Sequence, residues 1–109
     1  MDLDPRMQDL LAWLHERLAK ADFTQEKAAA RVGMSPASFS RWFKTRAGRT
    51  FQDYLNELRI AQVCSRLAGG DEHITEIAYA CGYNNLANFN LYFKNIMEMT
   101  PSEYRKNFR

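Results

Sequence analysis

An internal repeat restricts the fold of this chain more than any other feature of its 109 residues. The segment QEKAAARVGMSPASFSRWFKTRAGRTFQDY aligns with the later segment ITEIAYACGYNNLANFNLYFKNIMEMTPSEY. Gly33 and Gly82 are 49 positions apart, whereas Phe39 and Phe89 are 50 apart, so the second copy has one extra residue after its glycine. Further matched pairs are Ala29 and Ala78, Phe43 and Phe93, Lys44 and Lys94, Thr50 and Thr100, and Tyr54 and Tyr104. A repeat of this length indicates two copies of one supersecondary unit.

Residues 50–68, TFQDYLNELRIAQVCSRLA, predict a single amphipathic helix between the two units. Thr50 is the expected N-cap, and Gly69-Gly70 is expected to end the helix in a left-handed conformation. Asn56 and Arg59 are among the polar residues expected between the apolar positions. The apolar residues recur mainly at steps of three and four: Phe51, Tyr54, Leu55, Leu58, Ala61, Val63 and Leu67. Such a helix has apolar surface for neighbours on both sides.

Helix start and stop signals predict three helices before this connection. The first begins after Asp4, with a proline at its first position, and is expected to run to about Ala21. Thr24 caps a second, short helix. Ser35, again followed by proline, opens a third helix that ends at Gly48. Two helices joined by a short glycine turn are a candidate helix-turn-helix.

The second copy predicts the same helix pair, and Thr100 with Glu103 forms a capping box that starts a closing helix. The expected fold is therefore all-α, with about seven helices. We expect a first helix-turn-helix subdomain at residues 1–49, a linker helix at 50–68 and a second helix-turn-helix subdomain at 69–109.

The outer face of the third predicted helix favours contact with DNA. Phe39, Trp42, Phe43 and Arg46 share one side, and the aromatic side chains among them are expected to point into the core. The opposite face is slim, polar and cationic, which suits the major groove, where arginine forms paired hydrogen bonds with guanine. The candidate DNA-binding residues of this copy are Ser35, Ala37, Ser38, Ser40, Arg41, Lys44, Thr45 and Arg49. Lys44 or any of the serines taken alone is more simply an ordinary solvated helix residue, and it is the combination with the glycine turn and the repeat that indicates DNA binding.

The sixth predicted helix repeats this geometry with fewer charges. Its inward residues are expected to be Phe89, Tyr92, Phe93 and Ile96. Leu91 matches Arg41 and could make only apolar contact with a base; alternatively, it is buried against the linker or the closing helix. Asparagine can pair with adenine, but Asn84 or Asn85 is expected to cap the helix instead. The candidate DNA-binding residues here are Asn85, Ala87, Asn88, Asn90, Leu91 and Lys94.

Composition sets limits but does not identify the function. A net charge of +2 is too small to identify a nucleic-acid binder, and no apolar run or leader indicates a membrane or exported protein. Cys64 and Cys81 are expected to be core residues in a reducing compartment, with a disulfide left open, and the cytoplasm is the expected location. His15 and His73 lack companion metal ligands, and there is no catalytic constellation. We therefore expect no enzyme activity, metal or cofactor.

Three motifs resemble the DNA-binding domain of the AraC/XylS family of bacterial transcription regulators: SPASFSRWFKTRAGRTFQDYLNELR at 35–59, ITEIAYACGY at 74–83 and FNLYFKNIMEMTPSEYR at 89–105. The resemblance covers nearly the whole chain from about Met7. It implies two helix-turn-helix units joined by a rigid helix, each placing its second helix in a major groove. It also implies a companion domain, usually N-terminal, that senses a small molecule or mediates dimerisation. Leu91 and Glu98 depart from the family pattern, which more often has arginine and glycine there.

The favoured function is sequence-specific binding of double-stranded DNA to activate or repress transcription. RNA polymerase is a candidate partner, a small-molecule effector would act only through the companion domain, and this segment is expected to be monomeric. The alternative is a helical interaction module that binds a protein through the same faces. Salt separates the two, because counterion release weakens DNA binding steeply as salt rises.

Overall fold

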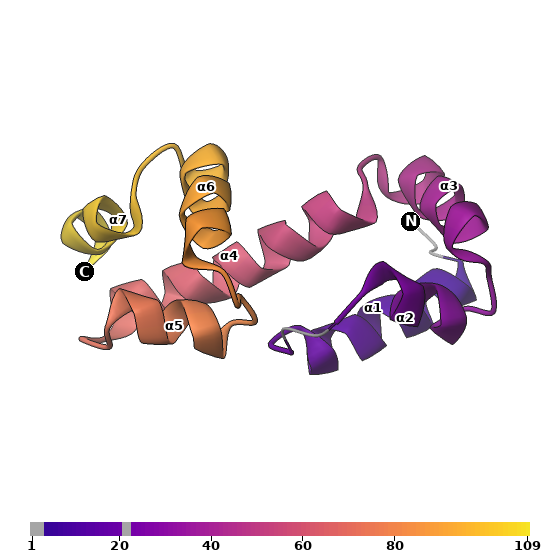
Figure 1. Cartoon of the computed structure of the whole chain (residues 1–109), viewed down its shortest axis with the longest axis horizontal. Coiled ribbons are helices and arrows are strands. Elements are labelled where there is room, and N and C mark those ends of the chain that lie inside the picture. The colour runs from indigo at the N-terminus through magenta and orange to yellow at the C-terminus, as the bar shows by residue number, and fades with distance from the viewer. Residues whose placement is uncertain (1–3, 21–22) are drawn as a thin grey trace.

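The computed structural model describes residues 4–20 and 23–109, and within them it is all-α, with seven helices. They are α1 (Pro5–Arg17), α2 (Gln25–Arg31), α3 (Pro36–Ala47), α4 (Phe51–Gly69), α5 (Ile74–Ala80), α6 (Leu86–Met97) and α7 (Pro101–Phe108). The molecule measures 42 × 29 × 21 Å. α4 crosses it diagonally, with α1, α2 and α3 around one end and α5, α6 and α7 around the other (Figure 1). The predicted all-α class and its helices are confirmed.

The sequence repeat corresponds to a repeat in three-dimensional structure. Gly33 and Gly82 both turn the chain with positive φ, at 73° and 104°. Thr50 and Thr100 both act as N-caps, of α4 and α7. The ring pairs that follow also match, with 5.6 Å between the centroids of Phe43 and Tyr54 and 5.9 Å between those of Phe93 and Tyr104. The two units are thus built alike from turn to closing contact.

The buried apolar side chains form two separate cores, one at each end of α4. α4 contributes Phe51 and Leu55 to the first core. Farther along, the same helix contributes Ile60, Val63, Cys64 and Leu67 to the second core. The first core is completed by Met7, Leu10, Leu14, Leu18, Phe23, Ala28, Ala29, Phe39 and Phe43. The second is completed by Ile77, Ala78, Cys81, Tyr83, Phe89 and Phe93. One helix therefore serves both units.

Polar side chains lie between the two cores, and here the predicted face of α4 is wrong. Asn56 and Arg59 were expected on the polar side but are 2% and 6% exposed, whereas Ala61 is exposed. The physical reason is that segments packed against the middle of α4 supply hydrogen-bond partners for these two side chains. Tyr83 Oη donates to Asn56 Oδ1 at 3.1 Å, and Arg59 donates to backbone carbonyls of the α1 end. We call this region of Asn56, Arg59, Gly82 and Tyr83 the seam.

Two predicted helix ends are also corrected. α1 ends at Arg17 rather than near Ala21, which lies outside the described residues. The amide of Lys20 donates to the Arg17 carbonyl at 3.1 Å, so the chain turns there. Gly70 is extended, with φ of −175°, so α4 stops without the predicted left-handed residue.

The remaining predictions concern cysteines and membranes. Cys64 and Cys81 are free and buried, as expected for core residues, and burial raises the pKa of both thiols. Within the described residues, no helix is long and apolar enough to cross a membrane.

Candidate nucleic-acid interface

Local sequence fixes both the start and the rotation of α3. The Ser35 side chain accepts a hydrogen bond from the Ser38 amide at 3.3 Å, and Gly48 ends the helix with φ of 77°. Phe39 and Phe43 are fully buried. Since residues four apart share a helix face, these two rings anchor one side of α3 and leave the other in solvent. All the candidates of this copy are exposed: Ser35, Ala37, Ser38, Ser40, Arg41, Lys44, Thr45 and Arg49.

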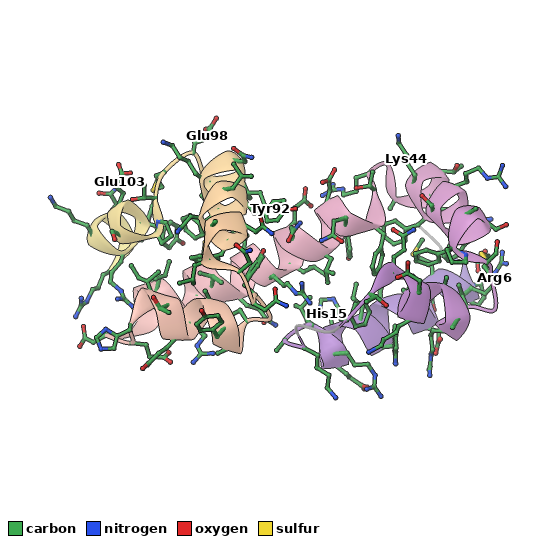
Figure 2. The ribbon with its side chains drawn as sticks, viewed as in Figure 1. Arg6, His15, Lys44, Tyr92, Glu98 and Glu103 are labelled. Atoms are coloured by element: carbon green, nitrogen blue, oxygen red, sulfur yellow. The ribbon has the colours of Figure 1, made fainter. Side chains whose placement is uncertain are left out.

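The basic residues around α3 divide into paired and unpaired cations. Arg49 forms an ion pair with Glu57 of α4. Arg46 lies 3.6 Å from the Asp4 carboxylate and places its guanidinium 5.7 Å from the centre of the Trp42 ring. Among the described residues, the side chains of Arg41 and Lys44 form no hydrogen bond or ion pair. Lys44 points away from the helix in Figure 2. Two cations on the outer face of α3 are therefore available to an anionic partner.

α6 presents its outer face in the same way but with different chemistry. Asn85 caps it, accepting from the Asn88 amide at 2.9 Å, which resolves the expected choice between Asn84 and Asn85. Phe89 and Phe93 are fully buried and anchor the inner side. All six candidates of this copy are exposed: Asn85, Ala87, Asn88, Asn90, Leu91 and Lys94. The side-chain oxygen of Asn85 already accepts the cap hydrogen bond, so Asn88 and Asn90 are the better candidates for a base.

Two apolar residues of α6 test the predictions about which way its side chains face. Leu91 is 56% exposed, so it lies on the outer face rather than against α4 or α7. Ile96, expected to face inwards, is instead 38% exposed. Phe89 and Phe93 set the inward direction of α6, and Met97, four residues after Phe93, packs against the second core, which leaves Ile96 at the edge of the inner face. The outer face of α6 thus combines leucine, asparagines and a single lysine.

Sequence reasoning missed two hollows beside the recognition faces. A hollow of about 830 Å³ lies next to α3, with Met7, Leu11, Trp42 and Tyr54 in its lining and Arg41 also contributing. A polar hollow of about 140 Å³ lies between α4 and α6, lined in part by residues that were not candidates, Gln52 and Tyr92. Tyr92 lies between these helices in Figure 2. No sequence pattern marks either, because each is formed by helices distant along the chain.

No group of three or more His, Cys, Asp or Glu side chains in residues 4–20 and 23–109 is placed to hold a metal ion.

Comparisons with known proteins place this geometry in a family. A family model described as a helix-turn-helix domain matches residues 28–107, which includes both units. The chain belongs to the AraC/XylS family of helix-turn-helix regulators. Over 103 residues it is 32% identical to the HTH-type transcriptional activator RhaS of Klebsiella pneumoniae, covering 94% of this chain. The match to RhaS of Citrobacter koseri is 33% identical over the same length. The chain spans 37% of the length of these relatives.

Solved structures of similar AraC-type domains share the whole arrangement. The C-terminal domain of AraT, a response regulator from Geobacillus stearothermophilus, superimposes with a TM-score of 0.91 at 27% identity, covering 98% of this chain and 88% of that one. The DNA-binding domain of AdpA, a global transcriptional factor solved in complex with a target DNA, gives 0.88 at 29% identity, covering 98% and 95%. The seven-helix arrangement around α4 is therefore the family fold.

Proposed function

We propose that this domain binds double-stranded DNA sequence-specifically, with α3 and α6 in successive major grooves, and so regulates transcription. The observation that carries the proposal is the repeated helix-turn-helix with an outer face of α3 on which Arg41 and Lys44 are unpaired. Family membership supports it, as does the likeness to the AdpA domain, whose structure contains a target DNA. The name of the RhaS relatives favours an activator over a repressor.

The proposed roles follow from side-chain chemistry. Arg41, in the outward centre of α3, would read a guanine through its paired donors, while Lys44 and Arg49 would meet phosphates. Arg49 would have to exchange its partner Glu57 for a phosphate. On α6, Asn88 or Asn90 would read adenine and Leu91 would contact a thymine methyl group. The serines and Thr45 would add hydroxyl contacts to phosphates or base edges.

We place this domain within a larger, effector-responsive regulator, because it spans 37% of the length of the RhaS relatives. In this arrangement, residues 1–49 and 69–109 are the two DNA-binding subdomains and residues 50–68 are the linker. A companion domain would sense the small molecule or dimerise, the isolated domain would be monomeric, and RNA polymerase would be a second partner. The cytoplasm, where the DNA of bacteria lies, is the corresponding location.

Selection from a random duplex pool tests the proposal directly. The expected result is one enriched site with two conserved parts about one helical turn apart, as expected for two helices in successive major grooves. A salt titration on that site should then show about a hundredfold loss between 50 and 200 mM if about four cations meet phosphates. Failure to enrich any sequence would contradict the proposal.

A second candidate function is docking of a protein, favoured by the apolar lining of the hollow beside α3. The same salt titration distinguishes it, since binding through an apolar contact changes little over this range. Enrichment of a DNA site with a steep salt dependence would reject protein docking as the primary role of this face.

A further inference from the structure

The seam contains a buried cation that joins α4 to the end of α1. Arg59 is 6% exposed. Its Nε donates to the Leu18 carbonyl at 2.9 Å, and its Nη2 donates to the Lys20 carbonyl at 2.8 Å. Leu18 is the C-cap of α1, where helix carbonyls lack partners within the helix, whereas the Lys20 carbonyl lies two residues farther on and also accepts from the Phe23 amide at 3.2 Å. Arg59 thus caps α1 from a different element.

The same guanidinium packs against the turn that leads into α6. It lies 5.8 Å from the centre of the Tyr83 ring. Gly82 approaches so closely that a Cβ there would lie 2.8 Å from Arg59 Nε and 2.8 Å from the Leu18 oxygen. Gly82 also has φ of 104°, so glycine is required both for space and for conformation. Arg59 therefore contacts the end of α1 in the first unit and the helix-turn-helix turn of the second.

Stability alone is a weak reason for this arrangement. No carboxylate among the described residues forms an ion pair with Arg59. Burial lowers the pKa of Arg59 because the charged form loses its hydration. A buried ion is costly, and apolar replacements of similar volume are often neutral or stabilising in such places. The arginine instead fixes the relative orientation of its neighbours, because its planar guanidinium contacts two carbonyl oxygens and one ring at the same time.

We infer that Arg59 is a positioning residue that fixes the relative placement of α3 and α6 and thereby sets the half-site spacing that the domain accepts on DNA. The inference rests on the proposed DNA-binding function. Its structural basis is that, within residues 4–20 and 23–109, the two cores have only α4 in common, and at the seam the first unit also touches the second directly.

Spacing is a sensitive readout of this placement. One base pair moves a half-site by about 3.4 Å and rotates it by about 35° around the duplex. A rigid pair of recognition helices cannot follow such a shift, whereas a pair that pivots about α4 can. Loss of the Arg59 contacts should therefore relax the spacing preference and leave each half-site contact unchanged.

The test uses the site found by selection, with zero, one or two base pairs inserted or removed between its halves. For the original protein we expect at least a tenfold loss of affinity at one base pair. Arg59→Met, similar in length but without donors, should reduce this ratio to below about threefold, while substitutions within either half-site cost as much as before. Arg59→Lys, which keeps the charge but lacks the planar guanidinium with its fixed pair of donors, should be intermediate.

Two glycine substitutions distinguish the effect of Arg59 from the effect of backbone strain in the turn. Gly82→Ala should relax spacing as Arg59→Met does, because the new methyl group displaces the guanidinium. Gly33→Ala is the matched control, since Gly33 has φ of 73° in the corresponding turn but open space around its Cβ position. It should destabilise the domain and keep the original spacing preference. Relaxed spacing in both alanine variants would assign the effect to turn strain and overturn the role of Arg59.

A measurement without DNA tests the role of Arg59 separately from the proposed DNA-binding function. Spin labels at Ser40→Cys on α3 and Asn90→Cys on α6, both exposed, report the distance between the recognition helices. The distribution should be narrow with Arg59 and broad in Arg59→Met, with Arg59→Lys deciding if the methionine variant does not fold. A folded variant with an unchanged distribution and spacing ratio would overturn the inference. Failure of the original protein to bind any duplex would instead reject the proposed function.

Discussion

At the scale of single residues, the two copies differ in the residue that ends the recognition helix. Gly48 ends α3 with φ of 77°, and Glu98 ends α6 in the same left-handed region with φ of 60°. An L-residue with a side chain is strained there by about 1–2 kcal/mol. Glu98 is exposed and points away from the helices in Figure 2, and its side chain forms no hydrogen bond or ion pair within the described part of the chain that would offset this strain.

Glu98→Gly should therefore stabilise the domain. Relief of the strain exceeds the extra chain entropy of glycine in the unfolded state, so we expect about 0.5–1 kcal/mol in the free energy of unfolding. Urea denaturation with an unchanged slope measures it. Gly48→Ala is the matched control and should lose about 1 kcal/mol. Destabilisation by Glu98→Gly would show that the glutamate side chain contributes a contact of its own.

Arg41 and Arg49 should differ in kind rather than in size. Arg41→Ala should cost about 1–3 kcal/mol at the selected site and relax preference at one or two base pairs. Arg49→Ala should weaken binding to all sequences alike. The loss of affinity should be smaller than for an unpaired arginine, because Arg49 must first leave Glu57. Titration of each variant on single-base substitutions of the site separates the two patterns. Equal, sequence-independent losses would show that Arg41 contacts phosphate only.

At the scale of elements, α3 and α6 have the same frame and different outer chemistry. Each is capped, anchored by two buried phenylalanines and ended by a left-handed residue. α3 presents Arg41 and Lys44, whereas α6 presents Leu91 and Lys94. We therefore expect α6 to read less sequence and to contribute less electrostatic affinity than α3.

Leu91→Arg should give α6 the chemistry of α3. Because Leu91 is 56% exposed, stability should change by no more than about 0.5 kcal/mol. Affinity should rise, or a guanine should become preferred in the distal half-site, as measured by repeated selection. Leu91→Met, which adds no donor, should keep the original site. Marked destabilisation without a new base preference would contradict this account of the asymmetry.

Sequence signals within a few residues predicted the helices and their caps well. Contacts between residues distant in the sequence could not be predicted from such signals. The caps at Thr24, Ser35 and Thr100 follow from hydrogen bonds within three residues, which sequence spacing specifies directly. The exposed outer faces of α3 and α6 follow from helical periodicity in the same way. The burial of Arg59 depends on carbonyls about forty positions away, so periodicity placed it on the wrong face. The prediction that Ile96 faces inwards also failed, because Met97 packs against the second core in its place.

At the scale of the whole molecule, the length of α4 sets a geometric demand on DNA. Its 19 residues span about 28 Å, whereas successive major grooves on one face are about 34 Å apart. Simultaneous insertion of α3 and α6 therefore requires the duplex to bend towards the protein.

Gel phasing should detect this bend on the selected site, together with a footprint over two major grooves. Arg59→Met provides the comparison, because a pivoting pair of units should bind with less curvature. A footprint confined to one groove on straight DNA would mean that only one helix engages.

The two cores also determine how the molecule opens. Cooperative units of a protein often coincide with supersecondary motifs, and here each unit has its own apolar interior. Amide hydrogen exchange should therefore divide α4 itself: amides before Asn56 should exchange with α1–α3, and those after Arg59 with α5–α7. Glu98→Gly should slow exchange in the second group only. A helix that is continuous in geometry would then belong to two folding units, each able to unfold while the other stays in place.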